Sequence, residues 1–158
     1  MYLFSDEALK SHAIYSLEND RSDIVKSALK ELFYLKQNKV DELTSFEVMD
    51  NYRFEILSTE EIPLIENCKY KGISEFKMFF SMKCEIQKKE VFRLIACLVG
   101  KGTFHSSRVE QSTWYTRSFS YTYYCDEVFD LELKNYRAID LTGEKEIYCG
   151  LDENGEWD

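Results

Sequence analysis

A strict alternation of apolar and polar residues from Phe76 to Ile86 constrains the fold of this chain more than any other feature. Every even position in this stretch is apolar, and most odd positions are polar. A period of two is typical of a β-strand with one buried face. The polar run Gln87–Glu90 then predicts a reversal into a second strand, Val91–Val99, which is apolar at nearly every position. We therefore expect an antiparallel hairpin at the centre of the fold.

The register of this hairpin follows from folding the chain about Lys88 and Lys89. Residues directly opposite each other share a face, so a slip of one residue would turn the apolar face to water. The other face of the second strand is also apolar, which favours a central position for this strand in the sheet. The expected pairs are Ile86 with Val91, Met82 with Ile95, Phe80 with Cys97 and Met78 with Val99.

Two helices are expected before the sheet. Ser5–Leu17 and Ser22–Leu35 both begin with residues that cap helices, and both carry apolar residues three and four positions apart. Strands follow from Tyr52 onwards in adjacent, hairpin-connected order. The predicted fold class is therefore α+β, with two N-terminal helices in residues 5–36 packed on a curved antiparallel β-sheet of about five to six strands. A single domain is expected to span residues 1–158.

Local signals divide the rest of the chain. Ser58–Lys69, which contains the only proline, is expected to be a loop, and Gly100–Gly102 is expected to be a turn. Arg108–Cys125 alternates again and predicts one long strand, which Asp126 and Glu127 interrupt. The aromatic residues expected on one face of this strand are Tyr115, Phe119, Tyr121 and Tyr123. The remaining expected segments are the short strands Val128–Leu133, Tyr136–Leu141 and Glu146–Gly150 and an acidic tail, Asp152–Asp158.

The residues that most often carry chemistry form no motif. The five cysteines favour free thiols in a reducing cytosol, since their number is odd and the chain is long enough to fold without cross-links. No two of them are close enough in sequence to suggest structural zinc. The two histidines, His12 and His105, give no predicted Cys–His or Asp–His pair. We therefore expect no enzyme activity, no metal and no cofactor. With no signal sequence and no long apolar run, a cytoplasmic protein is expected.

Charge is segregated along the chain, which has a net charge of -9. Residues 126–158 hold three Lys/Arg against eleven Asp/Glu, a net charge of -8. Each of these carboxylates can be explained as a solvated surface group, but together they can steer a basic partner. Interleaved tyrosines with Arg108 and Arg117 could stack on single-stranded nucleic acid, but the net charge disfavours this partner. The candidate partner-binding residues are Asp126, Glu127, Asp130, Glu132, Asp152, Glu153, Glu156 and Trp157.

In overall character the chain resembles the immunity proteins of bacterial contact-dependent growth inhibition and related polymorphic toxin systems. The resemblance covers the helices Ser5–Leu17 and Ser22–Leu35, the sheet from Tyr52 on and the acidic C-terminal end, without a shared motif. It implies a non-catalytic protein that binds and neutralises one basic cognate toxin, for example a nuclease. Inhibition would be steric and electrostatic, with no membrane or nucleic acid as partner.

A ligand-binding protein is the alternative. Helices followed by a strongly curved antiparallel sheet also resemble the cystatin-like and nuclear-transport-factor-like folds. In such a fold a small apolar molecule would bind between the sheet and the helices. Residues that pack a core have the same pattern as residues that line a cavity, so the sequence leaves both open. The expected lining residues are Phe80, Met82, Ile95, Phe119 and Tyr121.

Overall fold

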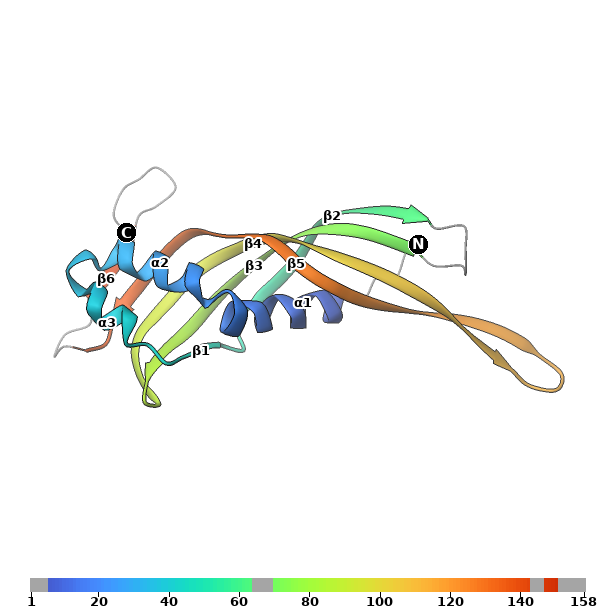
Figure 1. The fold of residues 1–158 in the computed structure, drawn as a ribbon, viewed down its shortest axis with the longest axis horizontal. Helices are drawn as coiled ribbons and strands as arrows, with labels where there is room; N and C mark the ends of the chain where they lie inside the picture. The colour runs from blue at the N-terminus through green and yellow to red at the C-terminus, as the bar shows by residue number, and fades with distance from the viewer. Residues whose placement is uncertain (1–5, 64–69, 143–146, 151–158) are drawn as a thin grey trace.

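The computed structural model describes residues 6–63, 70–142 and 147–150, in which helices are followed by an antiparallel sheet (Figure 1). The predicted α+β class is confirmed. The helices are α1 (Asp6–Tyr15), the π-helical segment η1 (Ser16–Asp20), α2 (Ser22–Leu32), the 3-10 turn η2 (Tyr34–Lys36) and α3 (Gln37–Asp41). The strands are β1 (Ser45–Val48), β2 (Arg53–Pro63), β3 (Tyr70–Ile86), β4 (Lys89–Ser112), β5 (Arg117–Asp140) and β6 (Ile147–Gly150).

The described strands form one six-stranded sheet in the order β1–β3–β4–β5–β6, with β2 also paired to β3. β1 pairs with the stretch Met82–Glu85 and β2 with the stretch Tyr70–Phe79, so these two strands lie end to end along the same edge of β3. The sheet therefore begins at Ser45, before the predicted start at Tyr52. β2 also runs on to Pro63, into a segment predicted as a loop, and its proline lies at the strand end where a missing N–H is tolerated.

The alternation in β3 was interpreted correctly, because its even residues form the buried face. The predicted register was wrong. Gln87 and Lys88 form a two-residue turn with φ of 50° and 67°, and Val91 is an extra residue in β4. Such turns match the twist of a hairpin but need left-handed backbone, which neither residue type signals. The actual pairs are Met82 with Leu94, Phe80 with Ala96 and Met78 with Leu98.

One face of the sheet is packed against the N-terminal helices (Figure 1). The predicted helical stripes supply this layer: Leu9, Ala13 and Leu17 from the first helix and its π-helical extension are fully buried, as are Val25 and Leu29 from the second. They pack against the even residues of β3 and β4 in a single core. Leu35 was expected in the second stripe, but α2 ends at Leu32 and the Leu35 side chain is exposed.

Gly100 and Gly102 lie within β4 and do not form the predicted turn. Both pair regularly with β3, and each faces a large side chain on the helix side. A Cβ atom on Gly100 would lie 2.6 Å from Leu131 Cδ2. A Cβ atom on Gly102 would lie 2.2 Å from Leu9 Cδ1. Gly102 therefore allows close packing of α1 on the sheet, and Gly100 leaves room for Leu131 of β5. Close approach of this kind is the other common reason for glycine inside a strand.

β4 and β5 form a long hairpin that extends beyond the other strands (Figure 1). Arg108–Cys125 is therefore two strand segments and a turn, and Tyr115 lies in that turn. Asp126 and Glu127 do not interrupt β5, which continues to Asp140 with three register shifts against β4. At each shift β5 has one residue more than β4, and such bulges bend the strand that carries them.

Three polar contacts tie the helical segments to the sheet. The Glu18 carboxylate accepts a hydrogen bond from the Val48 N–H at 2.7 Å, and burial raises the pKa of Glu18 more than this bond lowers it. Lys36 forms an ion pair with Asp140, whose side chain is 1% exposed. The Tyr136 hydroxyl donates to Glu31, and burial followed by this contact raises the pKa of Tyr136 to about 12.

None of the helices in the described ranges has the length and apolar character needed to cross a membrane.

Candidate functional site

Four of the predicted partner-binding residues lie on one short stretch of β5. We call Asp126, Glu127, Asp130 and Glu132 the acidic stretch; all four side chains are exposed. Along this stretch β4 is the sole described neighbour of β5, since β6 pairs only from Arg137 onwards. The carboxylates therefore lie on a strand whose other edge carries no described strand.

Bulges determine how the acidic stretch is presented. Asp126 is the extra residue between the pairs Thr103–Glu127 and Phe104–Cys125. Asp130 adopts φ of 53° within a second bulge, a conformation that aspartate tolerates better than most residues. Bulges re-aim side chains relative to a regular strand. The polar residues that were expected to interrupt the strand are thus the residues that bend it.

The other predicted site residues are not brought to this stretch. Asp152, Glu153, Glu156 and Trp157 lie outside the described residues, as does the whole tail 152–158. Asp140 belongs to the same acidic segment of the sequence, but it is buried and contacts Lys36 and Thr142. Its charge therefore serves the fold and adds nothing to an acidic surface.

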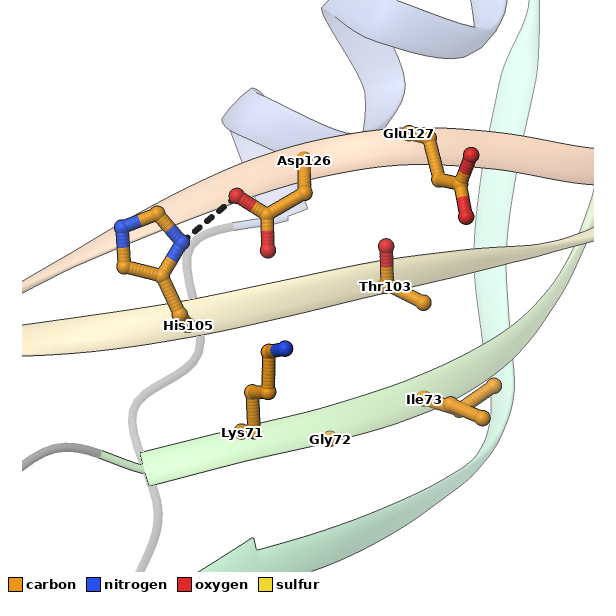
Figure 2. Close-up of a pocket in the computed structure, with 7 residues that line it drawn as sticks. All are labelled: Lys71, Gly72, Ile73, Thr103, His105, Asp126 and Glu127. Atoms are coloured by element: carbon orange, nitrogen blue, oxygen red, sulfur yellow. Dashed lines mark hydrogen bonds and ion pairs between the residues drawn. The ribbon is translucent and has the colours of Figure 1, made fainter. Parts of the chain in front are cut away.

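A pocket of about 530 Å³ lies beside the acidic stretch on the face of the sheet opposite the helices. Three strands contribute to it, and Figure 2 shows side chains from β3, β4 and β5 on this face. Two of its lining residues, Asp126 and Glu127, were predicted site residues. The other lining residues were not predicted from the sequence; they are Lys71, Gly72, Ile73, Thr103 and His105.

His105 and Asp126 form a pair across β4 and β5. The distance from His105 Nδ1 to Asp126 Oδ1 is 2.6 Å, and the side chains are 36% and 38% exposed. The His105 ring also stacks on Tyr124, with ring centroids 5.1 Å apart. The bulge brings Asp126 next to a histidine that the regular register pairs with Tyr124. This pair could have been predicted only from the correct hairpin register, because the two residues are far apart in sequence.

An imidazole beside a carboxylate can act as a general base if a substrate proton lies near the other ring nitrogen. Here the pair lies on the open face of the sheet, with more than a third of each side chain in contact with solvent. A solvent-exposed pair of this kind contributes little to stability. Its clear structural effect is to orient the Asp126 carboxylate at the mouth of the pocket.

Three of the four carboxylates in the acidic stretch, Glu127, Asp130 and Glu132, have no ion-pair partner among the described residues. The fourth, Asp126, contacts His105. Lys71 is the one lysine or arginine among the described residues that line the pocket. The described residues also contain no group of three possible metal ligands. The arrangement is therefore suited to electrostatic attraction of a positively charged surface.

The residues proposed to line a cavity under the sheet are divided between its two faces. Phe80 and Met82 point to the helices and are buried in the core. Ile95 pairs with Ser81 and so lies on the opposite face from Met82. The side chains of Phe119 and Tyr121 lie outside those that the structure describes. Within the described part, this set does not surround one chamber.

The cysteine side chains that can be described are free thiols, as predicted: Cys84 and Cys97 are buried and Cys125 is half-buried. Burial raises the pKa of all three. A raised pKa leaves little of the reactive thiolate at neutral pH, and Cys84 and Cys97 pack as small apolar residues of the sheet.

Comparison with known proteins adds no family, since no protein-family model matches the chain and no curated protein or solved structure matches it significantly.

Proposed function

We propose that this protein is a non-catalytic inhibitor of the immunity type, which binds and neutralises a basic cognate toxin in the cytosol. A nuclease is an example of such a toxin, because its substrate face must itself be basic. The observation that carries the proposal is the acidic stretch on β5, where four exposed carboxylates lie within residues 126–132. These groups would occupy the place of the phosphates that a basic active site is built to bind.

Electrostatics supports this assignment in two ways. The chain as a whole has a net charge of -9, so its long-range field attracts a basic protein. The acidic stretch adds a local source of that field, since three of its four carboxylates have no ion-pair partner among the described residues. Steering of this kind raises association rates by about tenfold or more at low salt.

Carboxylates on a strand edge that has no described neighbouring strand have a second use, which is to prevent pairing with strands of other molecules. The two roles make different predictions. If the carboxylates only protect the edge, their replacement changes solubility and leaves partner binding unaltered. If they recognise a basic partner, their replacement changes the association rate and its salt dependence.

The test begins with affinity purification of the chain from its native host and identification of the bound protein. The association rate of the two purified proteins is then measured by stopped flow at low and high salt. Glu127→Lys, Asp130→Lys and Glu132→Lys combined should slow association about tenfold or more at low salt and flatten the salt dependence. Charge reversal of Asp152, Glu153 and Glu156 tests the tail in the same way.

A matched control separates local from overall charge. Asp20, Glu47 and Asp50 are also exposed, and their conversion to lysine changes the net charge by the same amount. This control should slow association much less than the change in the acidic stretch. An unaltered rate in the acidic-stretch variant, or an equal effect in the control, would contradict the proposal. So would a partner that is acidic or that keeps its activity when bound.

A further inference from the structure

The far part of the β4–β5 hairpin projects away from the rest of the molecule (Figure 1). The last pair between β3 and β4 is Tyr70 with Ser106. Beyond it, β4 and β5 have only each other as described neighbours, up to the pair Ser112 with Arg117. We call residues 107–122 the arm. A two-stranded ribbon in water is marginally stable at best, so we expect the arm to contribute little to the stability of the fold.

The turn at the end of the arm is closed by its own hydrogen bonds. The Thr113 N–H donates to the Thr116 carbonyl oxygen at 2.8 Å. The Thr116 N–H donates to Thr113 Oγ1 at 3.1 Å, and the two hydroxyls are 2.5 Å apart. Trp114 and Tyr115 lie between these two threonines. The closed turn therefore holds both aromatic residues at the tip.

The two aromatic side chains at the tip are exposed. Trp114 is 93% exposed and Tyr115 is 69% exposed. Their rings contact each other edge to face, with centroids 4.8 Å apart and an interplanar angle of 81°. An exposed tryptophan stabilises nothing by burial in this chain, yet tryptophan and tyrosine are the residues that most often dominate binding energy at interfaces. A pair that is already in contact loses less side-chain freedom on binding.

Charge selects the class of partner for this tip. Nucleic acids and anionic membranes also accept aromatic side chains, but the net charge of -9 opposes both. The acidic stretch starts at Asp126, on β5, which leads away from the turn that forms the tip. At about 3.3 Å per residue, the strand from Tyr115 to Asp126 measures roughly 35 Å. A protein that meets both features must carry its basic surface and an apolar cleft about that far apart.

We propose that Trp114 and Tyr115 are the anchor of a second contact, in which the arm enters an apolar cleft on the basic protein bound by the acidic stretch. This inference rests on the proposed function and assigns the association rate and the dissociation rate to two different parts of the binding surface. The acidic stretch governs how fast the complex forms. The tip governs how slowly it dissociates, because buried aromatic anchors act mainly on the dissociation rate.

The test uses the purified chain and the basic protein recovered from the native host. Trp114→Ala with Tyr115→Ala should weaken affinity at least tenfold, through faster dissociation and with little change in the association rate. Leu35→Ala is the matched control, since Leu35 is also 93% exposed. It belongs to η2, which follows α2 and precedes α3, and these two helices lie at the end of the molecule opposite the hairpin tip (Figure 1). The control should alter affinity less than twofold.

Burial of the tip can be observed directly. Labelling with 5-fluorotryptophan gives one ¹⁹F resonance for each of the two tryptophans, and Trp114→Phe assigns that of Trp114. The Trp114 resonance should shift on addition of the partner. The increase in its relaxation rate caused by a dissolved paramagnetic agent should become smaller. An unchanged resonance in the complex would overturn the inference.

The remaining outcomes distinguish this inference from the proposed function. If acidic-stretch variants slow association while tip variants bind normally, the inference fails and the proposed function stands. If no basic protein binds, both fail. A Trp114 shift caused by phosphatidylcholine vesicles, by a single-stranded oligonucleotide or by self-association in sedimentation would also overturn the inference, because each assigns the tip to another partner.

Discussion

Leu9 and Gly102 are in a contact that no other residue at position 102 could make without a shift of the helix or its side chain. Leu9 Cδ1 lies 2.2 Å from the place where a Cβ atom on Gly102 would be. Leu9 is fully buried and comes from α1, while Gly102 belongs to β4. The depth at which the first helix packs on the sheet is thus determined by a missing side chain.

Gly102→Ala should destabilise the protein by about 1–3 kcal/mol, the usual cost of overpacking a core. Leu9→Ala alone should cost about 2–5 kcal/mol, because it opens a cavity. In the Leu9→Ala background the same change at Gly102 should cost less, since the added methyl group then occupies vacated space. Urea denaturation of the four proteins of this cycle provides the measurement. Additive effects would show that the two residues do not compete for the same volume.

The lowered pKa of Asp140 predicts that the free energy of unfolding decreases at acidic pH. Burial alone would raise the pKa of Asp140, but hydrogen bonds from Lys36 and Thr142 outweigh it and hold this pKa below the usual value. A carboxylate with a lowered pKa stabilises the fold above its unfolded-state pKa, near 3.9, and this stabilisation is lost as pH falls through the folded-state pKa. Asp140→Asn should cost about 1–3 kcal/mol at pH 7.

The loss caused by Asp140→Asn should shrink as the pH falls below 4, because the native protein then loses the same stabilisation. Chemical denaturation at several pH values tests this. Asp50→Asn, at an exposed position, removes one carboxylate without affecting Lys36 and should leave the pH profile unaltered. Parallel profiles for the native protein and Asp140→Asn would contradict the assignment of the lowered pKa to Asp140.

The described cysteines should differ in reactivity toward iodoacetamide. Burial, followed by nearby carboxylates, raises the pKa of Cys125 to about 11, so little thiolate is present at pH 8. Cys84 is fully buried and its pKa is raised further, again mainly by burial. Cys84 should therefore react at least tenfold more slowly than Cys125 in the folded protein, as measured by peptide mass spectrometry. Equal rates in the native state, with equal rates in urea, would contradict this order.

The predicted features that proved correct depend on periodicity over many residues. The buried faces of β3, α1 and α2 follow from spacings of two and of three to four, which persist whatever the neighbouring elements do. Leu35 marks the limit of this argument, since it continues the stripe after α2 has ended. The packing partner, which decides where a stripe ends, is not visible in the local sequence.

The errors occurred where one residue type has two structural uses. Glycine allows a turn, but it also allows the close approach that Gly102 makes to Leu9. The hairpin tip at Trp114 contains no glycine or proline, and the alternation on either side hides it. Of the candidate site, the acidic stretch could be predicted from charge alone. The pairing of His105 with Asp126 could not, because it depends on a bulge.

The three register shifts, at which β5 has one residue more than β4, determine how the β4–β5 hairpin curves. A ribbon with one edge longer than the other must curve toward its shorter edge, so the direction of the arm is encoded by a few single residues. Substitutions in β5 would leave that direction unaltered as long as the count of residues is kept. Asn135 belongs to the bulge between the pairs Ile95–Arg137 and Cys97–Lys134. Loss or gain of one amino acid near Asp130 or Asn135 would instead change the direction of the tip and the part of a partner that Trp114 contacts.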